Sequence, residues 1–282
     1  MNPARPFLLR NFQDAAAAPE GLLVTTAGNV RAGVADVVRE RAAQAGLPFV
    51  FRRDRSIAEL FRTEPFRHLL VWPVQGQPSL HRRGGGLPLF YHPGMALVRI
   101  KRLCENSRND RLLALAGVRP GDRILDCTAG LGSDAVVLSH AIGPQGSCTA
   151  LEVRPEIAQL LAIGRATYES GVPAFDAALR RLDVRCVPFR SALAVLPDDS
   201  YDIVYFDPMF DASVKGSHSL QRMRDFAELS SVTQSDLAQA LRVARRVVVV
   251  KGRWDSAWWR EWRIPHVDRK SGKVAYGLLW RK

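Results

Sequence analysis

The sequence is poor in cysteine and lysine and contains no long apolar run. Its four cysteines lie far apart and form no Cys-x-x-Cys pair, which argues against a disulfide framework or a zinc site and favours reduced thiols in a cytoplasmic protein. No run of about 18 uncharged apolar residues exists, so no membrane-spanning helix is predicted. The first 13 residues lack the apolar centre of a signal peptide, and the histidines lack metal-ligand spacing, so we predict neither a leader nor a metal site.

Basic residues outnumber acidic ones, and most of them are arginines. There are 40 Lys and Arg against 28 Asp and Glu, a net charge of +12, and only six of the basic residues are lysines. Residues 1–110 hold 16 basic and 9 acidic residues, so +7 of the excess lies there. Guanidinium groups bind phosphate through a planar fork, and so basic a chain favours a nucleic-acid partner. The alternative is a solvated arginine-rich surface without such a partner.

The order of apolar segments predicts a flexible N-terminus at residues 1–20 followed by two α/β regions. Residues 21–104 are interpreted as a small basic domain that ends in an Arg/Gly-rich connecting loop and a helix at 94–103. Its other predicted elements are strands at 21–26 and 47–51 around a helix at 30–45, a short helix at 56–61, and a hairpin of 68–72 with 78–81. Such a strand-helix-strand unit pairs its two strands in parallel.

Residues 105–282 alternate strand and helix, which is typical of a mostly parallel sheet with helices on both faces. Predicted strands lie at 123–126, 147–152, 183–188, 202–206 and 246–251, and predicted helices at 134–141, 155–170, 173–181, 219–229 and 233–244. Two further strands, at 262–266 and 273–280, are expected to add an antiparallel hairpin. The predicted fold class is therefore α/β with a doubly wound sheet.

The first motif with chemical meaning follows the strand at 123–126. Asp126 ends that strand, Gly130 and Gly132 follow, and a helix begins near residue 134. A strand, a glycine turn and a helix N-terminus bring backbone N–H groups close to a nucleoside-containing cofactor, and glycine permits the positive φ and close approach that this requires. An acidic residue at the strand tip suits a cationic amino-acid cofactor. A tight turn without any ligand is the alternative.

A second acidic residue strengthens this interpretation. Glu152 ends the next predicted strand, and in nucleotide-binding α/β folds an acidic side chain at that place holds the ribose diol. The third strand leads to Arg190 and Ser191, whose polar groups would reach an adenine edge. Lys251 ends the fifth strand at the same rim, where it would either meet a phosphate or merely cap the strand.

Asp207-Pro208-Met209-Phe210 follows the strand at 202–206. Ligands in such sheets lie beyond the carboxyl ends of the strands. The Asp207 carboxylate and the Pro208 carbonyl can each accept a hydrogen bond from an exocyclic amine, which orients its nitrogen toward an electrophilic methyl group. Phe210 can stack on a flat base. The alternative is a plain turn, because Asp-Pro often begins one.

The segment 81–93 combines arginines, glycines, histidines and aromatic residues. Arg82 and Arg83 are followed by three glycines and then by Phe90 and Tyr91. We interpret it either as a loop that contacts nucleic acid, with arginine for phosphate and the rings for stacking, or as a connector with buried aromatic residues.

With these residues placed, the chain resembles class I S-adenosylmethionine-dependent methyltransferases, and more narrowly the RsmJ-type small-subunit ribosomal RNA guanine-amino methyltransferases. Its N-terminal part is more similar to an uncharacterised Gram-positive branch. The resemblance spans about residues 80–255 and implies a Rossmann-like sheet. The motifs that carry it are Asp126-x-Thr128-Ala129-Gly130-Leu131-Gly132-x-Asp134, Leu151-Glu152, Asp207-Pro208-Met209-Phe210, Val248-Val249-Val250-Lys251 and the segment from His81 to Gly86.

The resemblance implies S-adenosylmethionine as cofactor and an RNA substrate, most simply ribosomal RNA. The cofactor contacts that it implies are Ser133, Asp134, Glu152, Val153, Arg190, Ser191 and Asp207. The chain departs from RsmJ proteins at Ser133, where they carry arginine, and at Arg190-Ser191, where they carry Ser-Ser. Two other functions stay open: methyl transfer to a small molecule or protein side chain, and a non-catalytic RNA-binding module.

Overall fold

The computed structural model describes residues 21–105, 110–208, 232–267 and 273–281. The described chain divides into two compact units, each with its own sheet. One comprises residues 21–92 together with Pro155–Tyr168, and the other comprises Pro93–Arg154 and the described residues from Glu169 onward. None of the described helices combines the length and the apolar character needed to cross a membrane.

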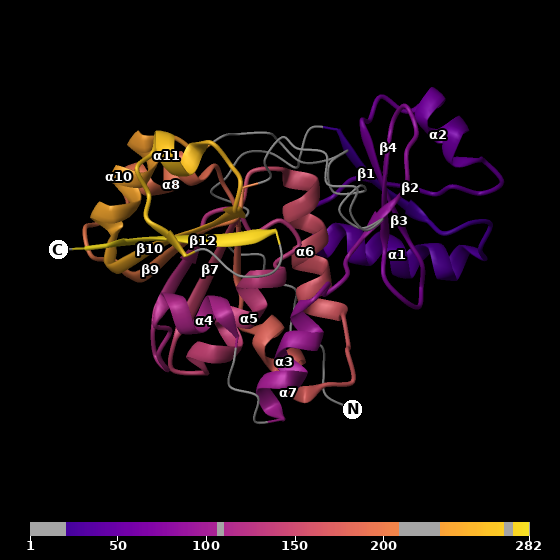
Figure 1. The fold of residues 1–282 in the computed structure, drawn as a ribbon. Coiled ribbons are helices and arrows are strands. Elements are labelled where there is room, and N and C mark those ends of the chain that lie inside the picture. Colours follow the sequence, from indigo (N-terminus) through magenta and orange to yellow (C-terminus); the bar gives the residue numbers. More distant parts are fainter. Residues whose placement is uncertain (1–20, 106–109, 209–231, 268–272, 282) are drawn as a thin grey trace. The chain divides into compact units, whose positions relative to one another are not determined.

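The first unit is built on a five-stranded sheet with strand order β2-β1-β3-β4-β5, of which Figure 1 labels β1 to β4. Its strands are β1 (Leu22–Thr26), β2 (Phe49–Val50), β3 (His68–Trp72), β4 (Ser79–Arg82) and β5 (Leu89–Phe90), and its helices are α1 (Ala32–Gln44), α2 (Ile57–Thr63) and α6 (Pro155–Thr167). β1 pairs in parallel with β2 and β3, and β3 pairs antiparallel with β4. The predicted strand-helix-strand unit and the predicted hairpin are therefore confirmed.

Apolar side chains from the sheet and from α2 form a small core in this unit. Leu23, Leu60, Leu69 and Val71 are buried together. The helix α2 begins where it does because the Ser56 hydroxyl accepts the backbone N–H of the third helical residue in a capping box. Burial of this face accounts for the docking of so short a helix.

The helix α6 contacts a buried tyrosine of the same unit through a glycine. A Cβ atom built on Gly164 would lie 2.2 Å from Cγ of Tyr91, whose side chain is only 2% exposed. The Tyr91 ring also packs edge-on against Tyr168, with 5.2 Å between the ring centroids. Only a residue without a side chain therefore fits at position 164.

We expect Gly164→Ala to lower the free energy of unfolding by about 1–3 kcal/mol, because the added methyl group overpacks a buried site. The matched control is Gly33→Ala in α1, where a Cβ would meet nothing within 4 Å. There alanine should stabilise the helix by about 0.5–1 kcal/mol. Denaturant unfolding of both variants measures the effect, and a stability change of the same sign in both would contradict the packing argument.

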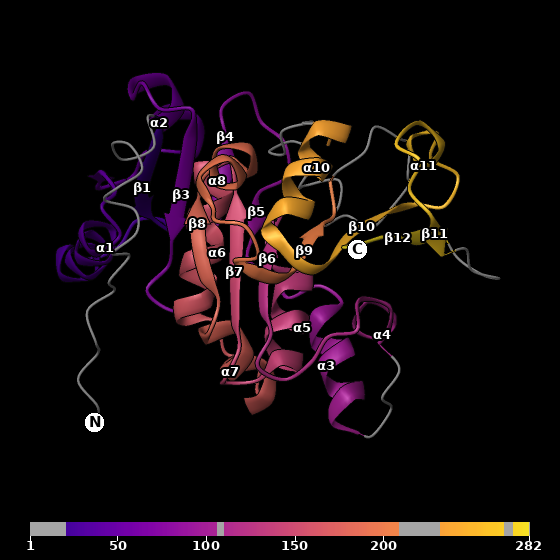
Figure 2. The ribbon, with the colours of Figure 1, turned by 90° about the vertical axis from the view of Figure 1, so that its left-hand side faces the viewer.

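The second unit is built on a seven-stranded sheet with strand order β11-β12-β10-β9-β6-β7-β8 (Figure 2). Its strands are β6 (Arg123–Asp126), β7 (Ser147–Glu152), β8 (Asp183–Cys186), β9 (Tyr201–Phe206), β10 (Ala244–Arg253), β11 (His266–Val267) and β12 (Val274–Trp280). Its helices are α3 (Ala96–Cys104), α4 (Arg111–Ala116), α5 (Ser133–Ile142), α7 (Pro173–Arg180), α8 (Phe189–Val195), α10 (Gln234–Val243) and α11 (Trp258–Glu261).

The predicted parallel sheet with an antiparallel C-terminal hairpin is confirmed. β10, β9, β6, β7 and β8 are parallel, whereas β12 pairs antiparallel with both β10 and β11. All four cysteines of the chain are free thiols. The helix predicted at 219–229 lies outside the described residues.

Two local predictions in this unit were wrong. The strand predicted at 262–266 is only the short β11 (His266–Val267), and residues 262–265 form the turn and loop after α11, which ends at Glu261. The strand predicted at 183–188 ends at Cys186, and the helix α8 begins at Phe189 with Pro188 as its N-cap. Short apolar and aromatic segments such as these fit a strand as well as a helix or a turn, so the residue pattern alone did not distinguish the possible structures.

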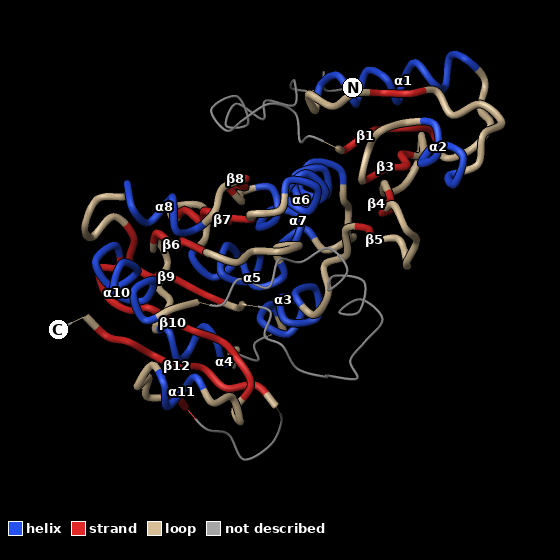
Figure 3. Tube along the Cα trace, turned by 90° about the horizontal axis from the view of Figure 1, so that it is seen from above, coloured by secondary structure: helices blue, strands red, loops and turns tan. Residues whose placement is uncertain are grey.

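The two faces of the seven-stranded sheet differ in chemistry at its carboxyl edge. Helices α5 and α10 cover opposite faces (Figure 3). Side chains alternate between the faces along each strand, and Val204 and Phe206 pack in the core with α10. The alternate residues Tyr205 and Lys251 instead hydrogen-bond Asp134 of α5. Polar groups therefore gather on the α5 face, which includes the predicted site residues Asp134 and Lys251.

Candidate active site

A sharp glycine turn joins β6 to α5. Gly130 has φ of +55° and Gly132 has φ of +77°, and Gly132 is the N-cap residue of α5. Oδ1 of Asp126 accepts the backbone N–H of Thr128 at 3.0 Å, which closes the start of the turn. Burial raises the pKa of Asp126 well above its usual value. The structure thus has the left-handed glycine conformations that a close approach of backbone to a ligand requires.

Glu152 ties the end of β7 to this turn. Oε2 of Glu152 accepts the backbone N–H of Gly130 at 2.9 Å, and Oε1 accepts the backbone N–H of Arg154 at 2.8 Å. The neighbouring Val153 is half-buried. The two acidic strand ends that the sequence singled out, Asp126 and Glu152, therefore flank one glycine turn.

Asp207 joins the second motif to the first. It follows β9 directly, and its backbone N–H donates to Oγ1 of Thr128 in the glycine turn at 2.7 Å. Partial burial raises the pKa of the Asp207 carboxyl group, and the ammonium group of Lys251 opposes that rise. The buried Pro208 follows, and Phe210 lies outside the described residues. The structure thus brings together two motifs that are 79 residues apart.

A chain of alternating charges runs through this site. Nζ of Lys251 lies 2.7 Å from Oδ2 of Asp207 and 2.8 Å from Oδ2 of Asp134. The Arg99 guanidinium donates to Asp134 and, at 2.6 and 2.9 Å, to both oxygens of Asp110. The order is Asp110, Arg99, Asp134, Lys251, Asp207, so each buried charge has a partner of opposite sign.

These contacts explain the shifted pKa values of Asp134 and Lys251. Although burial opposes it, Lys251 and Arg99 hold the pKa of Asp134 below its usual range. Burial also opposes the ammonium form of Lys251, but Asp207 and Asp134 raise its pKa well above the ordinary value. The hydroxyl of Tyr205 donates to Oδ2 of Asp134 at 2.8 Å. Asp134, predicted as a cofactor contact, is therefore also a structural hub.

The sequence did not identify Thr128, Arg99, Tyr205 or Asp110 as site residues. A signal existed for Tyr205, because strand alternation places it on the same face as Asp126 and Lys251. No local signal marked Arg99 among the basic residues of α3. Ser133, at the start of α5, donates its hydroxyl to the carbonyl of Pro93 at 3.4 Å.

Arg190 and Ser191 lie on the first turn of α8, not on an extended strand tip as predicted. The Arg190 guanidinium makes two hydrogen bonds to Asp236, at 2.9 and 2.8 Å. Asp236 belongs to the capping box that begins α10, so this ion pair ties two helices on one face of the sheet. Ser191 is exposed.

The two arginines predicted to bind nucleic acid lie in the other unit, at the end of β4. The Arg83 guanidinium donates to the backbone carbonyls of Phe61, Glu64 and Phe66 and lies over the Phe61 ring. Arg83 therefore fastens the end of α2 to the hairpin. Arg82 is exposed.

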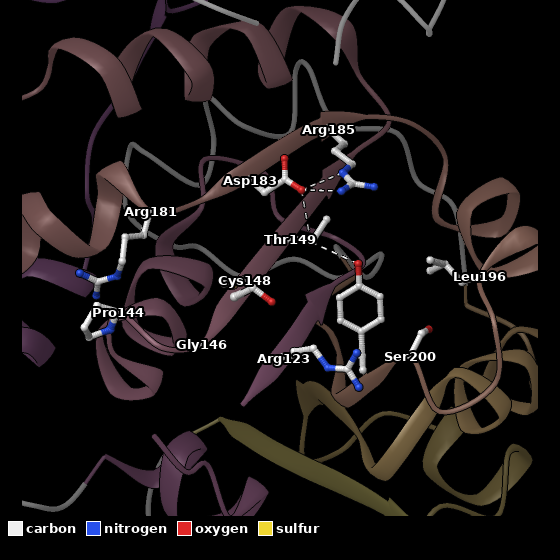
Figure 4. A pocket seen from close by; sticks show the side chains of 12 residues that line it. Arg123, Pro144, Gly146, Cys148, Thr149, Arg181, Asp183, Arg185, Leu196 and Ser200 are labelled. Atoms are coloured by element: carbon white, nitrogen blue, oxygen red, sulfur yellow. Dashed lines mark hydrogen bonds and ion pairs between the residues drawn. The ribbon is translucent and has the colours of Figure 1, made fainter. Parts of the chain in front are cut away.

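A pocket of about 580 Å³ lies at the amino ends of the strands of the seven-stranded sheet, opposite the carboxyl ends that carry the candidate site (Figure 4). Its wall includes Thr149, Asp183 and Arg185 near the amino ends of β7 and β8, and Tyr201, whose hydroxyl donates to Oγ1 of Thr149 at 3.2 Å. No predicted site residue lines it. In open parallel sheets ligands bind beyond the carboxyl ends of the strands, so we do not assign the reaction to this pocket.

The residues at the carboxyl edge fit an S-adenosylmethionine site. The edge has a glycine turn with two left-handed residues, a helix N-terminus, a buried carboxyl group at the first strand tip and a carboxylate at the second. No group of three or more His, Cys, Asp or Glu in the described part of the chain could hold a metal ion. The fold and this edge define a class I S-adenosylmethionine-dependent methyltransferase.

Comparison with known proteins gives the same class. The family model described as "Putative SAM-dependent methyltransferase" matches residues 93–276, and the chain belongs to this family, whose cofactor is S-adenosylmethionine. It is 32% identical to the uncharacterized protein YpiP of Bacillus subtilis over 91% of this chain and 98% of that protein. It is also 32% identical to the ribosomal RNA small subunit methyltransferase J of Tolumonas auensis over 75% of this chain and 83% of that protein. The resemblance found in the sequence is confirmed.

A solved structure shows the same fold. The S-adenosylmethionine-dependent methyltransferase NGO1261 of Neisseria gonorrhoeae matches with a TM-score of 0.56 and 16% identity, over 92% of this chain and 96% of that one. At this identity the likeness concerns the fold alone. It agrees with the α/β class and with the methyltransferase sheet predicted from the sequence.

Proposed function

We propose that this methyltransferase acts on an exocyclic amine of guanine in ribosomal RNA, in the cytoplasm. The observation that carries the proposal is the position of Asp207-Pro208: it follows β9 and is hydrogen-bonded to the glycine turn through Thr128. The net charge of +12 and the relatives named ribosomal RNA small subunit methyltransferase J support RNA as the substrate.

In this proposal the glycine turn and the neighbouring strand ends hold the cofactor. The residues assigned to it are Asp126, Gly130, Gly132, Ser133, Asp134, Glu152, Val153, Arg190, Ser191 and Asp207. Asp126 and Glu152 suit the cationic amino group and the ribose diol, respectively. When bound, S-adenosylmethionine supplies an electrophilic methyl group on a sulfonium.

The chain itself orients the amine. The Asp207 carboxylate accepts one amine hydrogen and the Pro208 carbonyl accepts the other, so the nitrogen lone pair points at the methyl carbon. The nitrogen–carbon bond forms as the carbon–sulfur bond breaks, the positive charge passes from sulfur to nitrogen, and the extra amine proton then leaves to solvent. Phe210 is proposed to stack on the base. The exposed Arg82 is proposed to contact phosphates, and Arg83, whose guanidinium donates to backbone carbonyls, is proposed to add its positive charge beside it.

The test is incubation of the protein with tritiated S-adenosylmethionine and ribosomal RNA. The RNA is taken from cells that lack the gene for this protein, and it is offered both as free RNA and in ribosomal subunits. We expect label in a nuclease-sensitive fraction that digests to a methylated guanosine, and an RNA affinity that falls steeply with salt. No label in any RNA, with cofactor binding still measurable by calorimetry, would overturn the RNA proposal in favour of a small-molecule or protein substrate. Absence of cofactor binding as well would favour a non-catalytic RNA-binding module.

A further inference from the structure

We propose that Lys251 is a positioning residue for Asp207: its ammonium group keeps the Asp207 carboxyl group ionised and holds one of its oxygens, so that the other faces the substrate amine. The inference rests on the proposed function, because it assigns the amine to Asp207. It gives Lys251 a role different from the phosphate contact expected from the sequence.

Strand register places Lys251 beside Asp207. In the parallel pair of β9 and β10, Val250 lies opposite Phe206, so the next residues lie side by side: Asp207 just beyond the end of β9, and Lys251 within β10, which continues to Arg253. Both side chains point to the α5 face, since alternate residues share a face. Nζ of Lys251 and Oδ2 of Asp207 are 2.7 Å apart. Within the described residues, no other cation pairs with the Asp207 carboxylate, and the Asp134 carboxyl group is close enough to hydrogen-bond it.

Lys251 is itself held in place from the other side. Its second partner, Asp134, also accepts hydrogen bonds from Arg99 and Tyr205. Asp134 therefore keeps two partners if Lys251 is removed, whereas Asp207 loses its only cationic partner among the described residues. The effect of removing Lys251 should consequently fall on Asp207.

The surroundings of Asp207 make this partner necessary. Burial and the charge of Asp134 favour the neutral form of Asp207, and Lys251 favours the ionised form. In the described part of the chain, the titratable groups that face this cluster are Asp126 on β6, Asp134 on α5, Tyr205 on β9, Lys251 on β10 and Tyr276 on β12, with Arg99 of α3 behind Asp134. Without Lys251 the charges nearest to Asp207 among the described residues are the carboxylates of Asp126 and Asp134, so Asp207 binds a proton at higher pH.

The consequence is a change in the pH dependence of the reaction. A protonated Asp207 carries an O–H donor and no longer offers an anionic acceptor to the amine, so activity falls as the pH drops through the pKa of Asp207. In Lys251→Met that fall should occur at higher pH. Activity lost near neutral pH should then return in alkaline solution, where Asp207 is ionised again.

The experiment compares Lys251→Met and Lys251→Arg with the wild type, and uses Lys101→Met on an exposed position of α3 as control. Methyl transfer to RNA is measured from acid to alkaline pH under cofactor saturation. For Lys251→Met we expect the acid limb of kcat to move up by at least one pH unit, which corresponds to a tenfold or larger loss of kcat on that limb. Because the proposed function also assigns Asp134 and Asp207 to the cofactor, the Kd of S-adenosylmethionine is measured separately, so that the saturating concentration is known for each variant. Lys251→Arg should restore the limb, and Lys101→Met should not move it.

A second measurement does not depend on the substrate. The Asp207 carboxyl carbon, assigned by comparison with Asp207→Asn, is titrated by NMR in the wild type and in Lys251→Met. An unchanged pKa in the variant, or a loss of kcat equal at every pH, would overturn the inference in favour of a purely structural lysine. A raised pKa together with no methylation of any RNA by the wild type would instead overturn the proposed function and leave the effect of Lys251 on Asp207 standing.

Discussion

Replacing Asp207 by asparagine should lower kcat for methyl transfer by about 10²- to 10³-fold, the loss typical of removing one group that stabilises the transition state. Aspartate has two acceptor oxygens, and one of them is bound by Lys251 at 2.7 Å. Asparagine keeps one acceptor oxygen but replaces the other with an NH₂ group, which can only donate, and it carries no negative charge. The position that faces either Lys251 or the substrate amine therefore loses its acceptor. Asp207→Ala should abolish turnover. Single-turnover kinetics with labelled cofactor measures the loss, because it separates methyl transfer from product release.

The matched control is Asp202→Asn, at the other end of the same strand. Asp202 is buried, and its carboxylate accepts the backbone N–H of Arg123 at 2.8 Å. This substitution should cost stability but leave kcat within a few-fold of the wild type. Full activity in a folded Asp207→Ala variant would refute the proposed mechanism, and so would an equal loss of kcat in both asparagine variants.

The second large effect is expected at Glu152, in cofactor binding. Hydrogen bonds to a charged group contribute about 1.5–3 kcal/mol each, and about 1.4 kcal/mol is a tenfold change in Kd. Loss of the ribose contacts proposed for Glu152 should therefore weaken S-adenosylmethionine binding by about 10²-fold in Glu152→Ala. Isothermal titration calorimetry with the cofactor gives the Kd directly.

Glutamine should not rescue this position. Both carboxylate oxygens of Glu152 accept backbone N–H groups, from Gly130 and Arg154, so the amide NH₂ of glutamine would face a donor. The control is Glu156→Gln, a glutamate that is equally buried but pairs with His68 in the other compact unit. A wild-type Kd in Glu152→Gln, or equal weakening in both glutamine variants, would contradict the assignment.

Local sequence patterns determined the parallel sheet and the position of its chemistry. The strands ending at Asp126, Glu152 and Phe206 have the predicted ends in the structure. These ends are locally encoded, because an apolar run stops where an acidic residue, a glycine or Asp-Pro begins. Since parallel strands end at one edge, the order of elements alone was enough to bring Asp126, Glu152 and Asp207 to the same place.

The partners of the charged side chains were decided only by tertiary structure. The pairing of Lys251 with Asp207 and Asp134, and of Arg190 with Asp236, joins residues 44 to 117 positions apart. Such pairs depend on strand order, on register and on the face that each helix presents, none of which leaves a local pattern. Residue type therefore marked Lys251 as a cation at the rim, whereas the neighbouring strand made it the partner of the proposed catalytic carboxylate.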